Sequence, residues 1–314
     1  MKSPQLIAMP HSLPEVQSQL LKWTGETSIL IGDIFDAVSK RFTEQCFPDR
    51  QEGLVLWQLQ ASCHATAESA LILVANVRLW DADVIIRSVV EGTLKFVFLT
   101  LGSDAERKMK LTEFDTAFAE IGQLKRHGRL EEFLSAVGDA DADEWRSFRD
   151  MLLSKDRLAE LQAKYPKKVR HPIEHRWSFG EICQSLRRSG VEGVSQLGHM
   201  MFNYGMSSHV AHQDIDGIGM VWDRNGRSDE RRAAVELAHG ARLISDVAVM
   251  SWLRAHALFK RCGCDNTPLK EFGKRLAQLH IATGAATDNF HEVEYGTPSN
   301  AEKPRARGSP VNPS

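Results

Sequence analysis

The sequence predicts an all-α fold: a multi-helix bundle with a central antiparallel helical hairpin and at most one short β excursion, near residues 217–226. Three observations predict it. Apolar residues recur at helical spacing from about residue 14 to 46. Residues 51–79 are rich in Ala and Leu and apolar nearly all round, as is typical of a central helix. Ser-x-x-Glu patterns that begin at Ser12, Ser103 and Ser178 indicate helix starts.

The first elements follow from where these patterns stop. Phe47-Pro48-Asp49 ends the first helix, and the second helix follows over 51–79. The segment Trp80-Asp81-Ala82-Asp83 predicts a turn, with Asp83 as the N-cap of a third helix over about 83–101. The short turn makes the second and third helices an antiparallel hairpin.

Shorter elements are expected after the hairpin. A fourth helix extends from Ser103 to about Lys125, and the polar stretch 129–164 predicts two surface helices. Two prolines among basic and imidazole side chains predict a loop over 165–177. Asn225-Gly226 suits a tight turn in the β excursion. Further helices are expected after Ser178, over about 194–212, over about 229–260, and from Thr267.

The length of 314 residues is enough for one large domain. We expect one helical domain over residues 1–284 and a disordered tail over 285–314, where Gly, Pro, Ser, Asn and charged residues replace the apolar period. The net charge of −2 lacks the basic excess of a dedicated nucleic-acid binder.

The chain carries the signals of a cytoplasmic protein that does not enter the membrane. Its five cysteines are odd in number, which favours reduced thiols over a disulfide framework. The N-terminus lacks the apolar run of a signal peptide. The most apolar long stretch, 84–101, contains Arg87, Glu91 and Lys95, and three charges are too costly for a membrane span.

Two sets of residues could carry chemistry. Arg87 and Glu91 are four positions apart on an apolar helix, so they share a face and can pair. Tyr204, Ser208 and His212 fall at i, i+4 and i+8 of another helix. A hydroxyl and an imidazole on one face could hold a phosphate or transfer a proton. Structural ion pairing and helix capping are the alternative explanations for these two sets.

These same residues carry a resemblance. Arg87-x-x-x-Glu91 after the Asp81-Ala-Asp83 turn, and later Tyr204-x-x-x-Ser208-x-x-x-His212, resemble a bacterial helical family known as domain of unknown function 5677. The resemblance covers about residues 68–214. The chain departs from the family pattern in Gln213, where the family commonly has proline. The resemblance implies that these five residues approach one another, and it implies no reaction.

Other patterns offer less. His209, His212, Asp214 and Asp216 have metal-ligand chemistry, but no remote ligand can be placed. Cys262-Gly-Cys264 lacks a second cysteine pair. Arg170 and His175 have the spacing of a metal-free ribonuclease motif, but Pro172 lies between them and such matches are expected by chance. We therefore predict no metal centre and no cofactor.

The sequence leaves two functional classes open. One is an effector of bacterial stress response or phage defence that acts on nucleic acid or nucleotide, with Arg87 holding an anion, Glu91 orienting it and His212 as acid or base. The other is a non-catalytic interaction protein whose buried polar residues fix helix register. RNA, a nucleotide and a second copy of the chain are the candidate partners.

Overall fold

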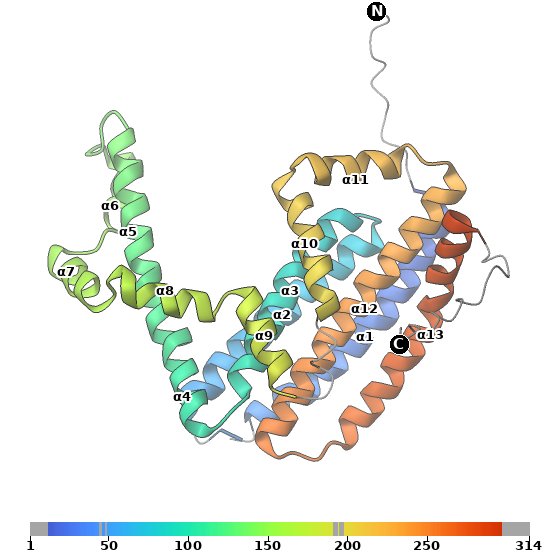
Figure 1. Cartoon of the computed structure of the whole chain (residues 1–314), viewed down its shortest axis with the longest axis horizontal. Helices are drawn as coiled ribbons and strands as arrows, with labels where there is room; N and C mark the ends of the chain where they lie inside the picture. Colours follow the sequence, from blue (N-terminus) through green and yellow to red (C-terminus); the bar gives the residue numbers. More distant parts are fainter. Residues whose placement is uncertain (1–11, 44–45, 48, 191–193, 195–197, 297–314) are drawn as a thin grey trace, which may run out of the picture.

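The computed structural model describes residues 12–43, 46–47, 49–190, 194 and 198–296. Every regular element in these ranges is helical, so the predicted all-α fold is confirmed. Five long helices form the bundle shown in Figure 1: α1 (Pro14–Thr43), α2 (Arg50–Ala75), α3 (Leu79–Thr100), α12 (Asp229–Cys262) and α13 (Thr267–Tyr295).

The central hairpin of α2 and α3 is also confirmed, but its turn lies earlier than predicted. The chain reverses over Asn76–Arg78, with Val77 at a φ of 56°. Trp80 and Asp83 therefore lie inside α3, and Asp83 is not its N-cap. The sequence predicts a turn at Trp80-Asp81-Ala82-Asp83 because nothing local distinguishes a buried aspartate from a turn aspartate.

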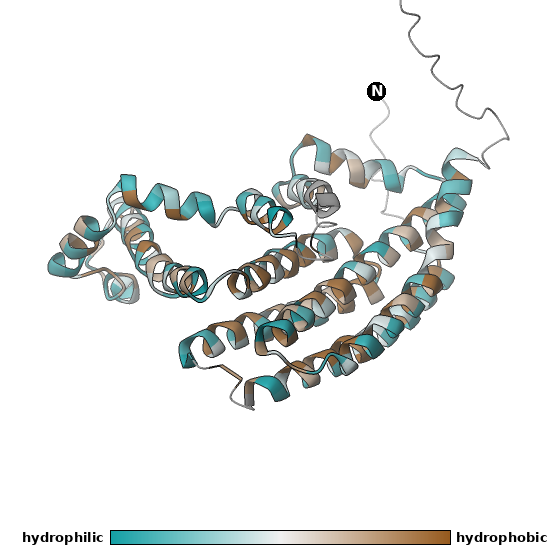
Figure 2. Ribbon diagram, turned by 60° about the horizontal axis from the view of Figure 1, so that its bottom comes forward, coloured by the Kyte–Doolittle hydropathy of each residue, from teal (hydrophilic) through white to brown (hydrophobic). Residues whose placement is uncertain are grey.

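The core of the bundle lies between α1, α2, α3 and α12, whose inward sides are apolar (Figure 2). Val38, Leu56 and Leu94 are among its buried side chains. Gly240 lets α12 approach α1 closely, because a Cβ built there would lie 2.3 Å from Leu20 Cδ2. Interiors this tightly packed tolerate little added volume.

An arm projects from the bundle (Figure 1). It begins after the capping box of Ser103 and Glu106, which is confirmed. The predicted loop over 165–177 is wrong, because it contains a helix with Pro172 inside. Arg176 and Trp177 anchor the end of that helix by donating to Glu113, at 2.6 and 2.9 Å. The arm comprises α4 (Asp104–Thr112), a π-helical turn (Glu113–Ala117), α5 (Phe118–Ala136), a 3-10 turn (Asp143–Trp145), α6 (Arg146–Arg149), α7 (Lys155–Lys164) and α8 (Lys167–Arg176).

Three helices lead back across the bundle: α9 (Phe179–Arg188), α10 (Gly198–His212) and α11 (Ile215–Asn225). The expected β excursion near 217–226 is therefore helical. Asp214 caps α11 by accepting the Gly217 amide at 3.0 Å, and Asn225 and Gly226 end the helix instead of turning a hairpin. The predicted start of α10 near 194 falls partly outside the described residues.

The two ends of the bundle differ from expectation in detail. No capping box between Ser12 and Glu15 is found in the described residues; the Ser12 hydroxyl donates to Glu236 at 3.2 Å. α13 continues to Tyr295, past residue 285, where the tail was expected to begin; residues 297–314 lie outside the described part. In the described ranges, no helix combines the length and the hydropathy needed to cross a bilayer.

Candidate functional site

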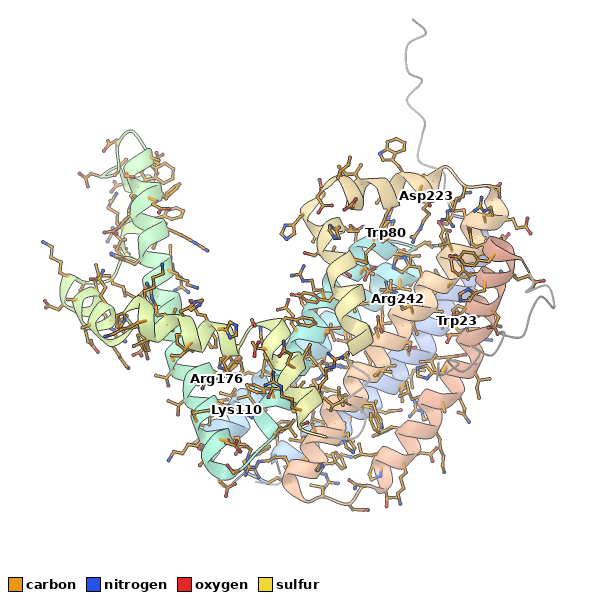
Figure 3. All side chains as sticks on the ribbon, viewed as in Figure 1. Trp23, Trp80, Lys110, Arg176, Asp223 and Arg242 are labelled. Carbon is orange, nitrogen blue, oxygen red and sulfur yellow. The ribbon has the colours of Figure 1, made fainter. Side chains whose placement is uncertain are left out.

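A polar network centred on Asp83 joins three helices, α3, α10 and α12. Arg242 of this network is labelled in Figure 3. Asp83 is 5% exposed, yet it accepts three hydrogen bonds. Ser207 of α10 donates to Oδ1 at 2.8 Å, and His239 Nε2 and Arg242 Nη2 of α12 contact Oδ2 at 2.9 and 2.6 Å. A buried carboxylate is stable only with such partners. The network therefore fixes α3, α10 and α12 against one another.

The partners of His239 determine its protonation. Its Nδ1 lies 2.7 Å from Nη2 of Arg224, and a guanidinium only donates. His239 Nδ1 is therefore the acceptor, and Nε2 carries the proton donated to Asp83. The imidazole is neutral, and both of its nitrogens are occupied within the network. Consequently His239 is not free to act as a base towards a ligand.

Burial and charge explain the two pKa shifts in this pair. Burial is the main cause that lowers the pKa of His239, to about 4, and the nearby Arg224 charge adds to it. Burial acts to raise the pKa of Asp83, but the hydrogen bond from His239 and the charge of Arg242 outweigh it and hold that pKa at about 2. At neutral pH the pair is a carboxylate and a neutral imidazole.

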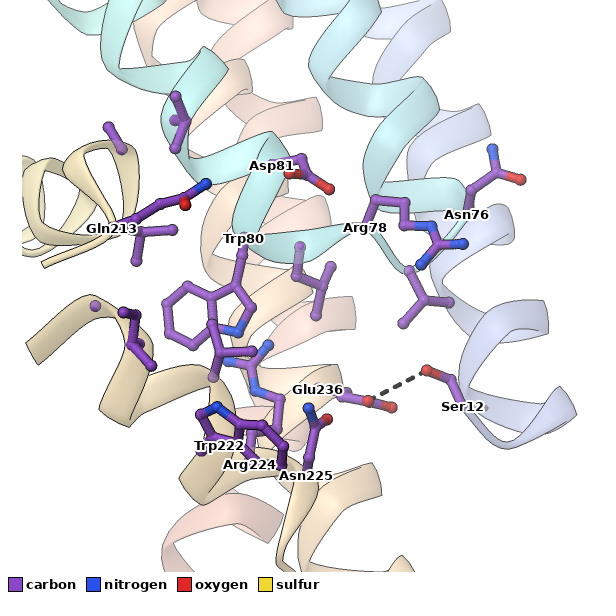
Figure 4. Close-up of a pocket in the computed structure, with 18 of the residues that line it drawn as sticks. Ser12, Asn76, Arg78, Trp80, Asp81, Gln213, Trp222, Arg224, Asn225 and Glu236 are labelled. Atoms are coloured by element: carbon purple, nitrogen blue, oxygen red, sulfur yellow. Dashed lines mark hydrogen bonds between the residues drawn. The ribbon is translucent and has the colours of Figure 1, made fainter. Parts of the chain in front are cut away.

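A cavity of about 1240 Å³ opens beside this network (Figure 4). Trp80 and Arg224 link the two: the guanidinium carbon lies 4.2 Å from the Trp80 ring centroid, and that ring meets His239 edge-on at 4.9 Å. The walls come from the α2–α3 turn, the start of α3, the end of α10, α11, and α12. Its polar and aromatic lining includes Ser12, Asn76, Arg78, Trp80, Asp81, Gln213, Trp222, Arg224, Asn225 and Glu236.

Three lining residues carry buried polar atoms that have no partner in the described part of the chain. These atoms are Trp80 Nε1, Arg224 Nε and Glu236 Oε2. Glu236 is 7% exposed and Arg224 is 9% exposed. Burial raises the pKa of Glu236. Buried polar groups are almost always hydrogen-bonded. Two donors and one acceptor that lack partners at one cavity therefore need an explanation.

The structure brings together three of the five predicted site residues. Arg87 donates to the Tyr204 hydroxyl at 2.7 Å, and that hydroxyl donates to Glu91 at 2.5 Å. The Arg87 guanidinium also lies 4.1 Å from the Tyr204 ring centroid, and Phe179 stacks on the ring at 3.7 Å. Burial and the neighbouring carboxylate raise the pKa of Tyr204, so the hydroxyl stays protonated. Lys95 completes the cluster, 3.7 Å from Glu91.

Ser208 and His212 do not join them. Ser208 is half-buried and His212 is exposed, and no hydrogen bond or ion pair in the described residues connects either to Glu91. Two helical turns separate His212 from Tyr204, which is about 12 Å along the axis. The expected meeting of imidazole and carboxylate is instead made by His239 with Asp83.

Sequence reasoning missed the Asp83 network, although one signal was present. His239 lies in an Ala- and Leu-rich segment of a long helix, where a polar side chain needs a buried partner. No local pattern identifies that partner, because Asp83 lies 156 positions away.

One expected metal candidate is partly assembled. His209, Asp214 and Asp216 place ligand atoms within 4.8 Å of one another, whereas His212 is not a member of the group. Asp214 is already engaged, since it caps α11 and contacts His209 Nδ1 at 2.7 Å. These contacts explain the cluster without an ion.

A family model described as a family of unknown function, DUF5677, matches residues 54–230, more than half of the chain. This confirms the resemblance, and the match extends beyond the expected 68–214 at both ends. No curated protein and no solved structure matches the chain.

Proposed function

Because the chain belongs to the family of unknown function DUF5677, whose description names no activity, we propose a function from its own residues. The protein is a cytoplasmic effector of bacterial stress response or phage defence that acts on a nucleotide or on a short unpaired nucleic-acid segment. The ligand lies in the cavity between α3, α11 and α12. The observation that carries this proposal is the set of unpartnered atoms on Trp80, Arg224 and Glu236.

The cavity has the chemistry that an unpaired base requires. Bases are held by stacking on aromatic side chains and by hydrogen bonds to their edges. Trp222 is 56% exposed on the cavity lining and offers a stacking face. Trp80 Nε1 is a donor, and the Glu236 carboxyl is an acceptor, or a donor once protonated.

The phosphate has candidate partners in the same cavity. Arg78 is exposed on the α2–α3 turn, and Arg224 carries the unpartnered Nε. Guanidinium groups suit phosphate oxygens because their donors form a planar fork. The net charge of −2 argues against extended electrostatic binding along a nucleic-acid duplex. A nucleotide or a short segment bound at one cavity fits this charge better.

Binding measurements test the proposal. Fluorescent mononucleotides and short single-stranded oligonucleotides are titrated into the full chain. We expect binding by the parent and a roughly 5- to 150-fold loss in Trp222→Ala, from a stacking contribution of about 1–3 kcal/mol. Trp145→Ala removes a tryptophan from the arm and is the matched control. Equal affinity in the parent and Trp222→Ala, or no binding to any of these ligands, would exclude the proposal.

A cellular assay tests the effector role separately. Induced expression of the parent should slow bacterial growth or reduce phage plaque formation, and Trp222→Ala should lose that effect at equal protein level. A parent with no effect on either readout would remove the defence assignment but leave ligand binding to be judged by titration.

The second candidate is a non-catalytic interaction protein, and one observation favours it. Asp83, Arg87 and Glu91 form a stripe on α3, and Ser207 and Tyr204 of α10 contact it. Such polar contacts can fix helix register without chemistry. This alternative expects substitutions in the stripe to change stability alone, and it expects the chain to bind none of the nucleotides.

A further inference from the structure

The end of α12 lies at the end of the bundle opposite α11 (Figure 1), and three cysteine thiols meet there. Cys262 is the last residue of α12, Cys264 follows two positions later, and Cys46 lies between α1 and α2. Their three sulfur atoms all lie within 4.8 Å of one another. All three thiols are free and half-buried. The sequence showed only the Cys262–Cys264 pair, because Cys46 is brought to it by the fold.

The helix end itself creates the arrangement of the pair. Gly263 takes the left-handed conformation, with φ 61° and ψ 29°, and so ends α12. The Cys264 amide then donates back to the Phe259 carbonyl at 2.9 Å, which folds Cys264 towards Cys262. Phe47, which follows Cys46, stacks on Phe42 of α1 at 5.4 Å between ring centroids.

Two guanidinium charges act on the sulfur atoms. Burial and the neighbouring thiols raise the pKa values of Cys262 and Cys264, and the charges of Arg261 and Arg41, respectively, oppose that rise. Arg261 is held in place by Glu52, which it contacts through two nitrogens at 2.8 Å. Cationic neighbours reduce the repulsion between thiolates that are bound to one ion.

We propose that Cys46, Cys262 and Cys264 bind one thiophilic metal ion, zinc(II) or copper(I), which ties the α1–α2 connection to the end of α12. Thiolate ligands select these ions over magnesium or calcium. Zn–S bonds of about 2.3 Å place sulfur atoms about 3.8 Å apart in a tetrahedral site. The observed separations, all within 4.8 Å, exceed this value by about 1 Å at most.

Metal binding accounts for the cluster better than a disulfide does. A disulfide joins two sulfurs at about 2.05 Å and leaves the third thiol unused. A metal ion uses all three. Copper(I) is satisfied by three thiolates, whereas zinc(II) takes a fourth ligand from outside this set. Because such an ion binds the folded chain, it stabilises that state in proportion to its concentration and affinity.

The test uses the full chain, purified under reducing and oxygen-free conditions and stripped with a chelator. Zinc(II) is titrated against a chromophoric competitor and copper(I) against a copper(I)-specific chelator. We expect one metal ion per chain, a higher melting temperature with metal, and thiolate-to-metal charge-transfer absorption when cobalt(II) replaces zinc. The ion that the protein withdraws from its competitor is the ion that the site binds.

Substitutions assign the ligands. Cys46→Ser should lose most of the affinity and the metal-dependent rise in melting temperature, and Cys264→Ser should do the same if Cys46→Ser does not fold. Cys183→Ala removes a thiol elsewhere and is the control. Parent protein that binds neither ion, or a Cys46→Ser variant that binds as tightly as the parent, would overturn the proposal.

Discussion

Asp83 and His239 are joined by a 2.9 Å hydrogen bond across 156 positions of the chain. The bond connects α3, which lies inside the matched family region, to a position on α12 beyond that region. Ser207 and Arg224, which contact the same pair, lie inside it. The matched region therefore holds only part of the network, and α12 completes it.

Removing the central carboxylate should destabilise the fold strongly. Asp83→Ala leaves the buried His239 without its acceptor and leaves the half-buried Arg242 with Asp246 as its remaining carboxylate partner, so we expect a loss of about 3 kcal/mol, at the low end for a broken buried pair. Urea unfolding measures the loss. Asp81→Ala is the matched control, because Asp81 is exposed in the first turn of α3 and should cost about 1 kcal/mol or less. Equal losses in the two variants would contradict the central role of Asp83.

The pH dependence of stability should reveal His239. Its pKa is about 4 in the folded chain against 6.5 in the unfolded chain. Below pH 6.5 the unfolded chain binds a proton that the folded chain refuses, so this contribution to stability is complete above pH 6.5 and lost as pH falls to about 4. The full difference is on the order of 3 kcal/mol.

Asp246 acts in the opposite direction and must be separated from His239. Burial raises the pKa of Asp246 to about 6, so its contribution is complete below pH 3.8 and lost as pH rises to about 6. The parent curve therefore sums two opposed slopes. Unfolding free energies of parent and His239→Gln, compared at pH 4.5 and 7, isolate the histidine: the parent should lose more stability on acidification. Parallel curves would show that His239 is not held neutral.

The Tyr204 hydroxyl should contribute to stability through both of its partners. Tyr204→Phe keeps the stacking on Phe179 but removes hydrogen bonds to two charged groups, Arg87 and Glu91, so we expect a loss of about 1–3 kcal/mol. Ser208→Ala, one turn further along α10, removes no hydrogen bond within the described residues and should change stability by about 0.5 kcal/mol or less. Chemical unfolding of both variants measures the two losses in unfolding free energy. Similar losses would show that the Tyr204 hydroxyl contributes no stability through Arg87 and Glu91.

The catalytic role proposed for His212 has a direct test. His212 is exposed, so His212→Ala should melt within the error of the parent. The role requires that this variant lose the growth or phage effect while it remains folded. We expect this variant to match the parent in cells, because the structure leaves His212 outside the cluster of Arg87, Glu91 and Tyr204. Loss of the effect in folded His212→Ala would restore the catalytic role.

The long helices could be predicted because apolar periodicity is a local property of the sequence. The same reasoning misplaced the α2–α3 turn, since Trp80 and Asp83 look like turn residues when their partners on α12 are unknown. The predicted loop at Pro172 was wrong for the same reason, because Glu113 anchors the end of α8 from 63 positions away. Local rules describe what a segment prefers, and distant contacts decided these two cases.

The contacts of the candidate site could likewise be predicted only in part. The resemblance implies that five residues approach one another, and the structure brings Arg87, Glu91 and Tyr204 into contact but not Ser208 or His212. The contact between Ser207 and Asp83 spans 124 positions and depends on how α10 is rotated on α3. A helix that is rotated by one residue exchanges Ser208 for Ser207, and helical spacing alone does not fix that rotation.

The guanidinium of Arg254 is 0% exposed, and the side chains that accept its hydrogen bonds are neutral. It donates to Gln60 Oε1 at 2.7 Å and to Thr93 Oγ1 at 2.6 Å. Replacing a buried charge by an apolar side chain of similar length is often nearly neutral, whereas removing one partner leaves the charge under-satisfied. We therefore expect Gln60→Leu to cost about 3 kcal/mol in urea unfolding, and Arg254→Met to cost less. In the double variant, Arg254→Met should recover most of the Gln60→Leu loss. If Arg254→Met lowers the free energy of unfolding more than Gln60→Leu does, the hydrogen bonds of the guanidinium outweigh the cost of burying its charge. Neutral oxygen acceptors would then be sufficient to stabilise the buried guanidinium.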